Sequence, residues 1–157
     1  MKWLSNWLDH LSRLSITILL MWMTVVLFFQ VGGRYLLDSG MAWTEEMARY
    51  AMIWTVFLGA AVATKDGSQI RVPVLEKIFP TLKKQLKRLQ HVVFLIYLFL
   101  VIVISWDTLK VVYFQTSPNM GISMAIVYAI MPLSFIIMFV HVLTQWRSTP
   151  TQKRGSL

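Results

Sequence analysis

The sequence predicts an all-α integral membrane protein with four transmembrane helices and amphipathic interfacial helices. Composition is the first reason, because 57% of the 157 residues are apolar and only 14% are charged, against roughly 25% charged in soluble domains. Long stretches without any charged residue are the second reason. The third is the uneven distribution of lysine and arginine among the connecting segments, which also predicts the orientation of the chain. These features favour a single membrane domain over residues 1–157.

The first segment joins an amphipathic stretch to an apolar one. In residues 3–13, tryptophan and leucine recur at helical spacing, as expected of a helix that lies in the membrane interface. Residues 14–33 follow without a charge, and a span needs about 20 apolar residues. A signal peptide is the alternative, with Val31-Gly32-Gly33 as the cleavage site, although its apolar core is normally only roughly 7–15 residues long.

The second predicted span, residues 43–64, carries charge only at its beginning. Thr44 is a candidate N-cap. Glu45 and Glu46 precede Arg49 by four and three residues, so either carboxylate can pair with this guanidinium on one helix face. The group is either an ion pair at the outer interface that starts the helix, or a polar patch that docks another membrane protein.

The same helix has a face of small residues, formed by Ala48, Thr55, Gly59 and Ala63. Small side chains let helix backbones approach closely in lipid. This face therefore packs either within the chain or against another subunit. The residues that we predict at a subunit interface on this helix are Trp43, Glu45, Glu46, Arg49, Thr55, Gly59 and Ala63.

The remaining two spans are separated by a turn. An amphipathic stripe at residues 74–88 precedes the third predicted span, residues 89–110. Pro-Asn and a nearby glycine within residues 118–121 then favour a turn. The fourth predicted span is 122–146, and Pro132 in its middle should kink it, because proline removes one backbone hydrogen bond.

Positive charge is concentrated on one side of this four-span plan. Twelve of the 15 lysines and arginines lie in the N-terminal segment, the middle loop and the C-terminal segment. This asymmetry predicts that both termini are cytoplasmic. It also accounts for the net charge of +8 without any nucleic acid, because the basic residues face anionic lipid headgroups. The residues that we predict to anchor the chain to the membrane surface are Trp3, Trp7, Lys83, Lys84, Lys87 and Arg88.

Candidate residues for catalysis or for binding a cofactor are scarce. The chain has no cysteine, which excludes a thiol nucleophile and thiolate metal ligands. His10, His91 and His141 are far apart in the sequence, and no pair of carboxylates is placed for acid–base catalysis. We therefore expect no enzymatic activity, no metal and no cofactor.

The middle of the chain contains four distinctive motifs. They are Arg34-Tyr35, the WTEEMARY motif at 43–50, the FLGAA motif at 57–61 and the IRVPVL motif at 70–75. Together with the four-span plan, they resemble the small membrane subunit, of DctQ type, of tripartite ATP-independent periplasmic (TRAP) transporters. One position departs from the family: many members have a histidine where this chain has Gln69, which puts a histidine-based role there in doubt.

The resemblance implies a function that composition does not give. The small subunit would be a scaffold in the bacterial inner membrane, paired with a large membrane subunit. The large subunit would import a carboxylate, such as a C4-dicarboxylate or sialic acid, driven by sodium. A periplasmic substrate-binding protein would deliver the substrate. Residues that we expect to help dock this protein are Arg34, Asp38 and Lys110.

Two alternatives to the scaffold role remain. The first is a self-sufficient small four-helix transporter. Small multidrug exporters use an acidic residue within the first span, and residues 14–33 contain none. The second is an assembly protein of another membrane complex.

Overall fold

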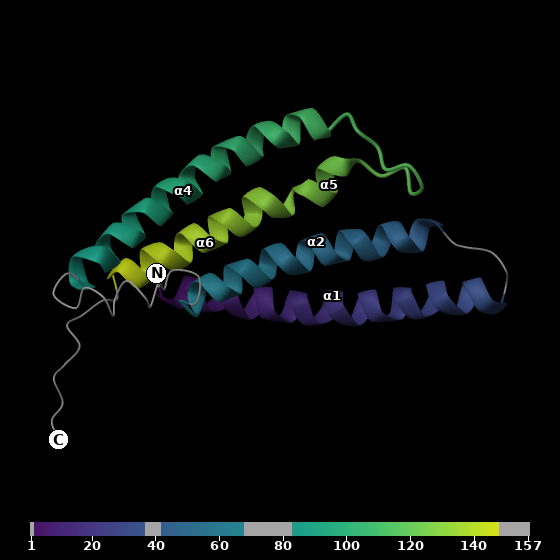
Figure 1. Ribbon diagram of the computed structural model, residues 1–157, viewed down its shortest axis with the longest axis horizontal. Coiled ribbons are helices and arrows are strands. Elements are labelled where there is room, and N and C mark those ends of the chain that lie inside the picture. Colours follow the sequence, from purple (N-terminus) through teal and green to yellow (C-terminus); the bar gives the residue numbers. More distant parts are fainter. Residues whose placement is uncertain (1, 37–41, 68–82, 148–157) are drawn as a thin grey trace, which may run out of the picture.

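The computed structural model describes residues 2–36, 42–67 and 83–147, which form long helices in two antiparallel pairs (Figure 1). The helices are α1 (Lys2–Leu36), α2 (Ala42–Lys65), α4 (Lys83–Val112), α5 (Met124–Tyr128) and α6 (Ile130–Arg147). α1 pairs with α2, and α4 pairs with α5 and α6, which follow one another along nearly one line. Four helical segments are long and apolar enough to cross a membrane. The fold class is confirmed, and the chain is a multi-pass membrane protein.

The first helix differs from the sequence prediction. Residues 3–13 do not form a separate interfacial helix but the first part of α1, which runs unbroken through all 35 residues. The reason is that neither proline nor glycine interrupts the sequence before Gly32. At about 1.5 Å rise per residue, α1 is roughly 50 Å long, whereas the hydrocarbon core is only roughly 30 Å thick. Trp3 and Trp7 are exposed near its start, and their role as anchors stays a prediction.

The third span also begins earlier than predicted. α4 starts at Lys83, so the last part of the stripe at 74–88 belongs to this helix, and residues 74–82 lie outside the described residues. Lys83, Lys84, Lys87 and Arg88 are therefore in the first turns of a spanning helix.

The fourth span is interrupted where the sequence predicts a kink. α5 ends at Tyr128 and α6 begins at Ile130. Pro132 lacks the N–H that would bond to the carbonyl of Tyr128, and its ring crowds that carbonyl. The next backbone bond, from Leu133 N to Ala129 O, is long at 3.4 Å. The predicted disturbance of the helix at this proline is confirmed.

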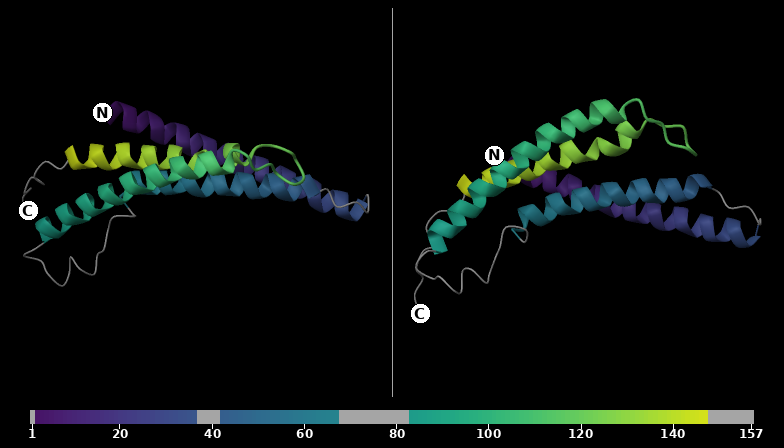
Figure 2. Two further views of the ribbon diagram at one scale, coloured as in Figure 1. Left: turned by 90° about the horizontal axis from the view of Figure 1, so that it is seen from above. Right: turned by 45° about the horizontal axis from the view of Figure 1, so that its top comes forward.

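α6 is the central helix of the molecule, with α2 on one side and α4 on the other (Figures 1 and 2). The buried core consists of Ala61 from α2, Leu98 from α4, and Ile137, Met138 and Val142 from α6. In the most apolar 18-residue stretch of each span, 44% of the residues are buried in the fourth span but only 6% in the first. α1 and α4 therefore present most of their apolar side chains outward, to lipid or to another subunit.

Candidate functional site

The carboxylate of Glu46, in the first turns of α2, is buried and accepts four hydrogen bonds. Its Oε1 accepts from the hydroxyls of Ser117 and Tyr50, both at 2.5 Å. Its Oε2 accepts from the backbone N–H groups of Asn119 and Met120, at 3.1 and 3.2 Å. We call these five residues the Glu46 cluster. All four donors are neutral, so the hydrogen bonds stabilise the carboxylate without cancelling its charge.

The segment that Glu46 binds is a short hairpin between α4 and α5. An antiparallel bridge between Thr116 and Ser123 closes it. Gly121, at the turn, has φ of +67°, which favours glycine because it has no Cβ. Since three of the four donors come from this hairpin and one from α2 itself, Glu46 fixes the hairpin to the beginning of α2.

The predicted ion pair of Glu45 or Glu46 with Arg49 is wrong. Glu46 points to the hairpin instead, and Glu45 Oε1 accepts a hydrogen bond from Gln30 Nε2 of α1 at 3.1 Å. Arg49 is exposed and forms no ion pair with any residue that the structure describes. The physical reason is burial: four preorganised donors surround the Glu46 carboxylate, and an exposed guanidinium keeps its water.

The small-residue face of α2 is open at Gly59. A Cβ built there would meet no atom within 4 Å in the part of the chain that is described. Ala48, Thr55 and Ala63 are half-buried, and the Thr55 hydroxyl bonds back to the carbonyl of Ala51 at 2.8 Å. Around Gly59, this face therefore has room for a helix from another subunit. Trp43, at the start of α2, is exposed.

A second polar cluster lies at the opposite end of the helices. Asp9 Oδ2 accepts from Lys65 Nζ at 2.8 Å, and Asp9 Oδ1 pairs with Arg13 Nε at 3.1 Å. Arg13 also pairs with Asp66 Oδ1 at 2.9 Å. We call these four residues the Asp9 cluster. It joins the early turns of α1 to the last turn of α2 through alternating charges.

α6 joins the other helices at this end. The side-chain amide of Gln145 lies 2.8 Å from the carbonyl oxygens of both Thr64 and Lys65, which are among the last carbonyls of α2 and need donors. The Ser5 hydroxyl lies 2.8 Å from Nδ1 of His141, which is 1% exposed. The left view of Figure 2 shows the start of α1 crossing to lie beside the end of α6.

The residues predicted to dock a soluble partner are only partly described. Arg34, in the last turn of α1, is exposed, and Lys110, near the end of α4, pairs with Asp107. Both lie at the same end of the helices as the Glu46 cluster, and Asp38 lies outside the described residues. Their docking role stays a prediction. Among the described residues, no group of three or more histidine or acidic side chains could hold a metal ion.

The sequence does not predict that the residues of either cluster lie together. Glu46 and Ser117 are 71 positions apart, and Asp9 and Lys65 are 56 apart, so local spacing does not reveal them. The sequence offers one usable signal for the Glu46 cluster, which is that successive spans cross the membrane in opposite directions. It places the start of the second span and the turn after the third span at the same end of the molecule.

Comparison with known proteins identifies a family. Residues 23–150 match the family model described as tripartite ATP-independent periplasmic transporters, DctQ component. A putative TRAP transporter small permease protein of Haemophilus influenzae is 28% identical, and the match covers 95% of this chain and 93% of that protein.

Two further relatives carry more specific names. The isethionate TRAP transporter permease protein DctMQ of Oleidesulfovibrio alaskensis is 33% identical over 88% of this chain, which spans only 23% of that protein. The sialic acid TRAP transporter small permease protein SiaQ of Vibrio cholerae is 26% identical, over 51% of this chain and 46% of that protein. Because the family model covers most of its length, this chain belongs to the DctQ family, the small permease components of tripartite ATP-independent periplasmic transporters.

Proposed function

We propose that this chain is the scaffold subunit of a sodium-driven TRAP transporter that imports an organic acid. Membership of the family implies a large membrane partner. The observation that carries the scaffold role is the distribution of charge. Residues 14–33, 50–64, 89–106 and 111–146 contain no aspartate, glutamate, lysine or arginine, and these stretches include the middle of each described span.

Transport of an anion with sodium requires more than these spans contain. The substrate and the ion lose water near the middle of the membrane, so polar groups or broken helices must replace it. The interruption at Ala129 is the one break within the described spans, and no charged side chain accompanies it. The large subunit would therefore supply the transport site, and a periplasmic binding protein would supply the substrate.

The names of the relatives support an organic anion as the substrate. One relative is named for sialic acid and another for isethionate. The first is a carboxylate and the second a sulfonate, so both present an anionic oxygen group. We propose a carboxylate for this transporter, as the resemblance implies.

We further propose that the large subunit packs on α2 around Gly59. Gly59→Leu should leave the folding of this chain unchanged, since no atom from the described residues lies within 4 Å of the new Cβ. The same change should reduce co-purification with the large subunit roughly tenfold, because the leucine separates two helix backbones. Gly32→Leu is the matched control, since the surroundings of Gly32 on α1 are equally open.

Affinity purification from native membranes provides the measurement. Normal recovery of the large subunit with Gly59→Leu would exclude this face as the contact. Equal loss with both leucine variants would show that the effect is not specific to α2.

The orientation of the chain is a separate proposal. We place the Glu46 cluster on the periplasmic side and the Asp9 cluster on the cytoplasmic side, because of the positive-inside asymmetry. Thr116 and Gln85 are exposed at opposite ends, and the chain has no native cysteine. In intact cells, an impermeant thiol reagent should label Thr116→Cys but not Gln85→Cys. The reverse pattern would invert the orientation.

A further inference from the structure

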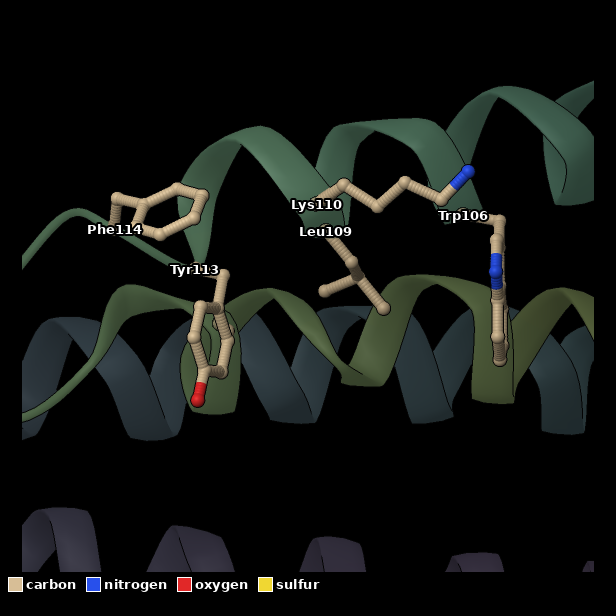
Figure 3. A pocket seen from close by; sticks show the side chains of 6 residues that line it. Trp106, Leu109, Lys110, Tyr113 and Phe114 are labelled. Carbon is tan, nitrogen blue, oxygen red and sulfur yellow. The ribbon is translucent and has the colours of Figure 1, made fainter.

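An open groove of about 500 Å³ lies between the end of α4 and the start of α5 (Figure 3). The residues that line it are Trp106, Leu109, Lys110, Tyr113, Phe114 and Ala125. The side chains of Trp106, Leu109 and Tyr113 extend from α4 toward the neighbouring helix, while Lys110 lies along α4 (Figure 3). The walls are therefore apolar and aromatic, with one cation at the edge.

The aromatic walls of the groove are not covered by the described part of the chain. Trp106, Tyr113 and Phe114 are 60%, 66% and 86% exposed. Trp106 lies in the last two turns of a membrane span, and Tyr113 and Phe114 lie just beyond its end, which is the depth that tryptophan and tyrosine favour beside lipid headgroups. Their exposed rings therefore present apolar surface at the level of a lipid's glycerol backbone.

Lys110 lines the groove, and its partner Asp107, which is not among the lining residues, brings a negative charge beside it. Lys110 Nζ lies 2.8 Å from Asp107 Oδ1, one helical turn away, and the two side chains are 67% and 69% exposed. A pair so exposed gains little from its own contact, since water screens it. It can therefore open and bind a partner that offers both charges at the same spacing.

We propose that this groove binds one zwitterionic phospholipid with a phosphoethanolamine headgroup. The lipid phosphate would contact Lys110, and its ammonium would donate hydrogen bonds to Asp107. Val103 and Phe99 precede Trp106 by three and seven residues, which places them on the same face of α4, and both are exposed. The acyl chains would lie along this apolar face.

Ethanolamine fits this edge better than the other common headgroups. Its primary ammonium has N–H groups that donate hydrogen bonds to a carboxylate. The quaternary ammonium of choline has no N–H group and cannot do so. Glycerol headgroups have no cation for Asp107, and diacylglycerol also lacks the phosphate for Lys110. The lipids therefore differ in how many of the two charged side chains they can contact, so the order in which the headgroups bind tests the proposal.

The experiment uses the purified full chain in a mild detergent, with bound lipid counted by native mass spectrometry. Dioleoyl lipids with phosphoethanolamine, phosphocholine and phosphoglycerol headgroups are titrated in turn, together with dioleoylglycerol. One phosphoethanolamine lipid should bind about fivefold more tightly than the others. Equal retention of all four would overturn the proposal, as would a failure to retain the phosphoethanolamine lipid.

Variants at the edge separate the two charges. Lys110→Ala should weaken the binding of all three phospholipids about fivefold. Asp107→Asn should abolish only the preference for the phosphoethanolamine lipid. Trp106→Ala should weaken the binding of all four lipids, since it removes one aromatic side chain that lines the groove. These side chains are exposed, so the fold should tolerate each change.

The control variants are Arg34→Ala, an exposed cation at the same end, and Trp22→Ala, an exposed tryptophan within α1. Both should bind the phosphoethanolamine lipid like the unaltered chain. Unchanged binding in Lys110→Ala and Asp107→Asn would contradict the site. Tight cover of the groove by the large subunit, with no lipid retained in the complex, would also contradict it. Neither result would affect the scaffold role, because that role does not depend on lipid binding.

Discussion

The two ends of the molecule hold a buried or nearly buried carboxylate in opposite ways. At one end, Glu46 accepts only neutral donors, two from hydroxyls and two from backbone N–H groups. At the other end, Asp9 pairs with two cations, Lys65 and Arg13. The Glu46 cluster keeps the negative charge of its carboxylate, whereas in the Asp9 cluster the two cations neutralise the negative charge of Asp9.

This difference separates two structural tasks. The Glu46 carboxylate holds a hairpin, because backbone N–H groups and a serine hydroxyl can surround an acceptor only when the loop has one defined shape. The Asp9 cluster joins helix ends through long, flexible side chains that tolerate small shifts. We therefore expect the Glu46 cluster to be sensitive to the identity of one residue, and the Asp9 cluster to be sensitive to salt.

The largest effect is expected from Glu46→Gln. The amide would place N–H groups among four donors, leaving at least one buried donor without an acceptor. The midpoint of thermal unfolding should fall on the order of 5 °C. Hydrogen exchange of the Asn119 and Met120 amides should accelerate roughly tenfold or more.

Glu45→Gln is the control for this change, since Glu45 is exposed and accepts a hydrogen bond from Gln30 rather than from the hairpin. Its hairpin amides should exchange at the normal rate. Normal protection of Asn119 and Met120 in Glu46→Gln would show that the hairpin holds its shape without the carboxylate.

A smaller effect is expected at the other end. The side chains of Asp9 and Lys65 are 12% and 23% exposed, so water reaches the pair and screens it. A double-mutant cycle with Asp9→Asn and Lys65→Gln should give a coupling of about 1 kcal/mol, measured by denaturant unfolding in detergent. A coupling indistinguishable from zero would mean that the pair contributes nothing.

Salt distinguishes the two ends further. Raising ionic strength to about 1 M shortens the screening length to roughly 3 Å, so the Asp9 pairs should weaken. Stability of the unaltered chain should fall slightly, and Asp9→Asn should remove most of this dependence. Glu46→Gln should keep it, because the hydrogen bonds of Glu46 come from neutral groups. Equal salt dependence in all three proteins would remove the distinction between the clusters.

The number and type of spans could be predicted from the sequence, because apolar length and proline chemistry are local properties. Four charge-free stretches gave four helices, and Pro132 marks the interruption between α5 and α6. Helix ends were less predictable. The amphipathic residues 3–13 have the composition of an interfacial helix, but nothing in them breaks the α-helix, so α1 continues through them.

The polar contacts could not be predicted from the sequence, because they depend on how the helices pack. Spacing suggested that Glu46 pairs with Arg49 on one helix face. Packing of the hairpin against α2 gives Glu46 three donors from the hairpin, and the Tyr50 hydroxyl of α2 is the fourth. Gly59 shows the same limit: its small-residue pattern was visible, but only the packed helices showed that no described part of the chain covers it.

The central claim is that this chain supports transport without performing it, and reconstitution tests this most directly. Proteoliposomes with this chain alone, a sodium gradient and the loaded binding protein should take up no labelled organic acid. Adding the large subunit should produce uptake, and omitting this chain should abolish it. Sodium-driven uptake by this chain alone would contradict the claim, and full uptake by the large subunit and binding protein without this chain would show that the scaffold is dispensable.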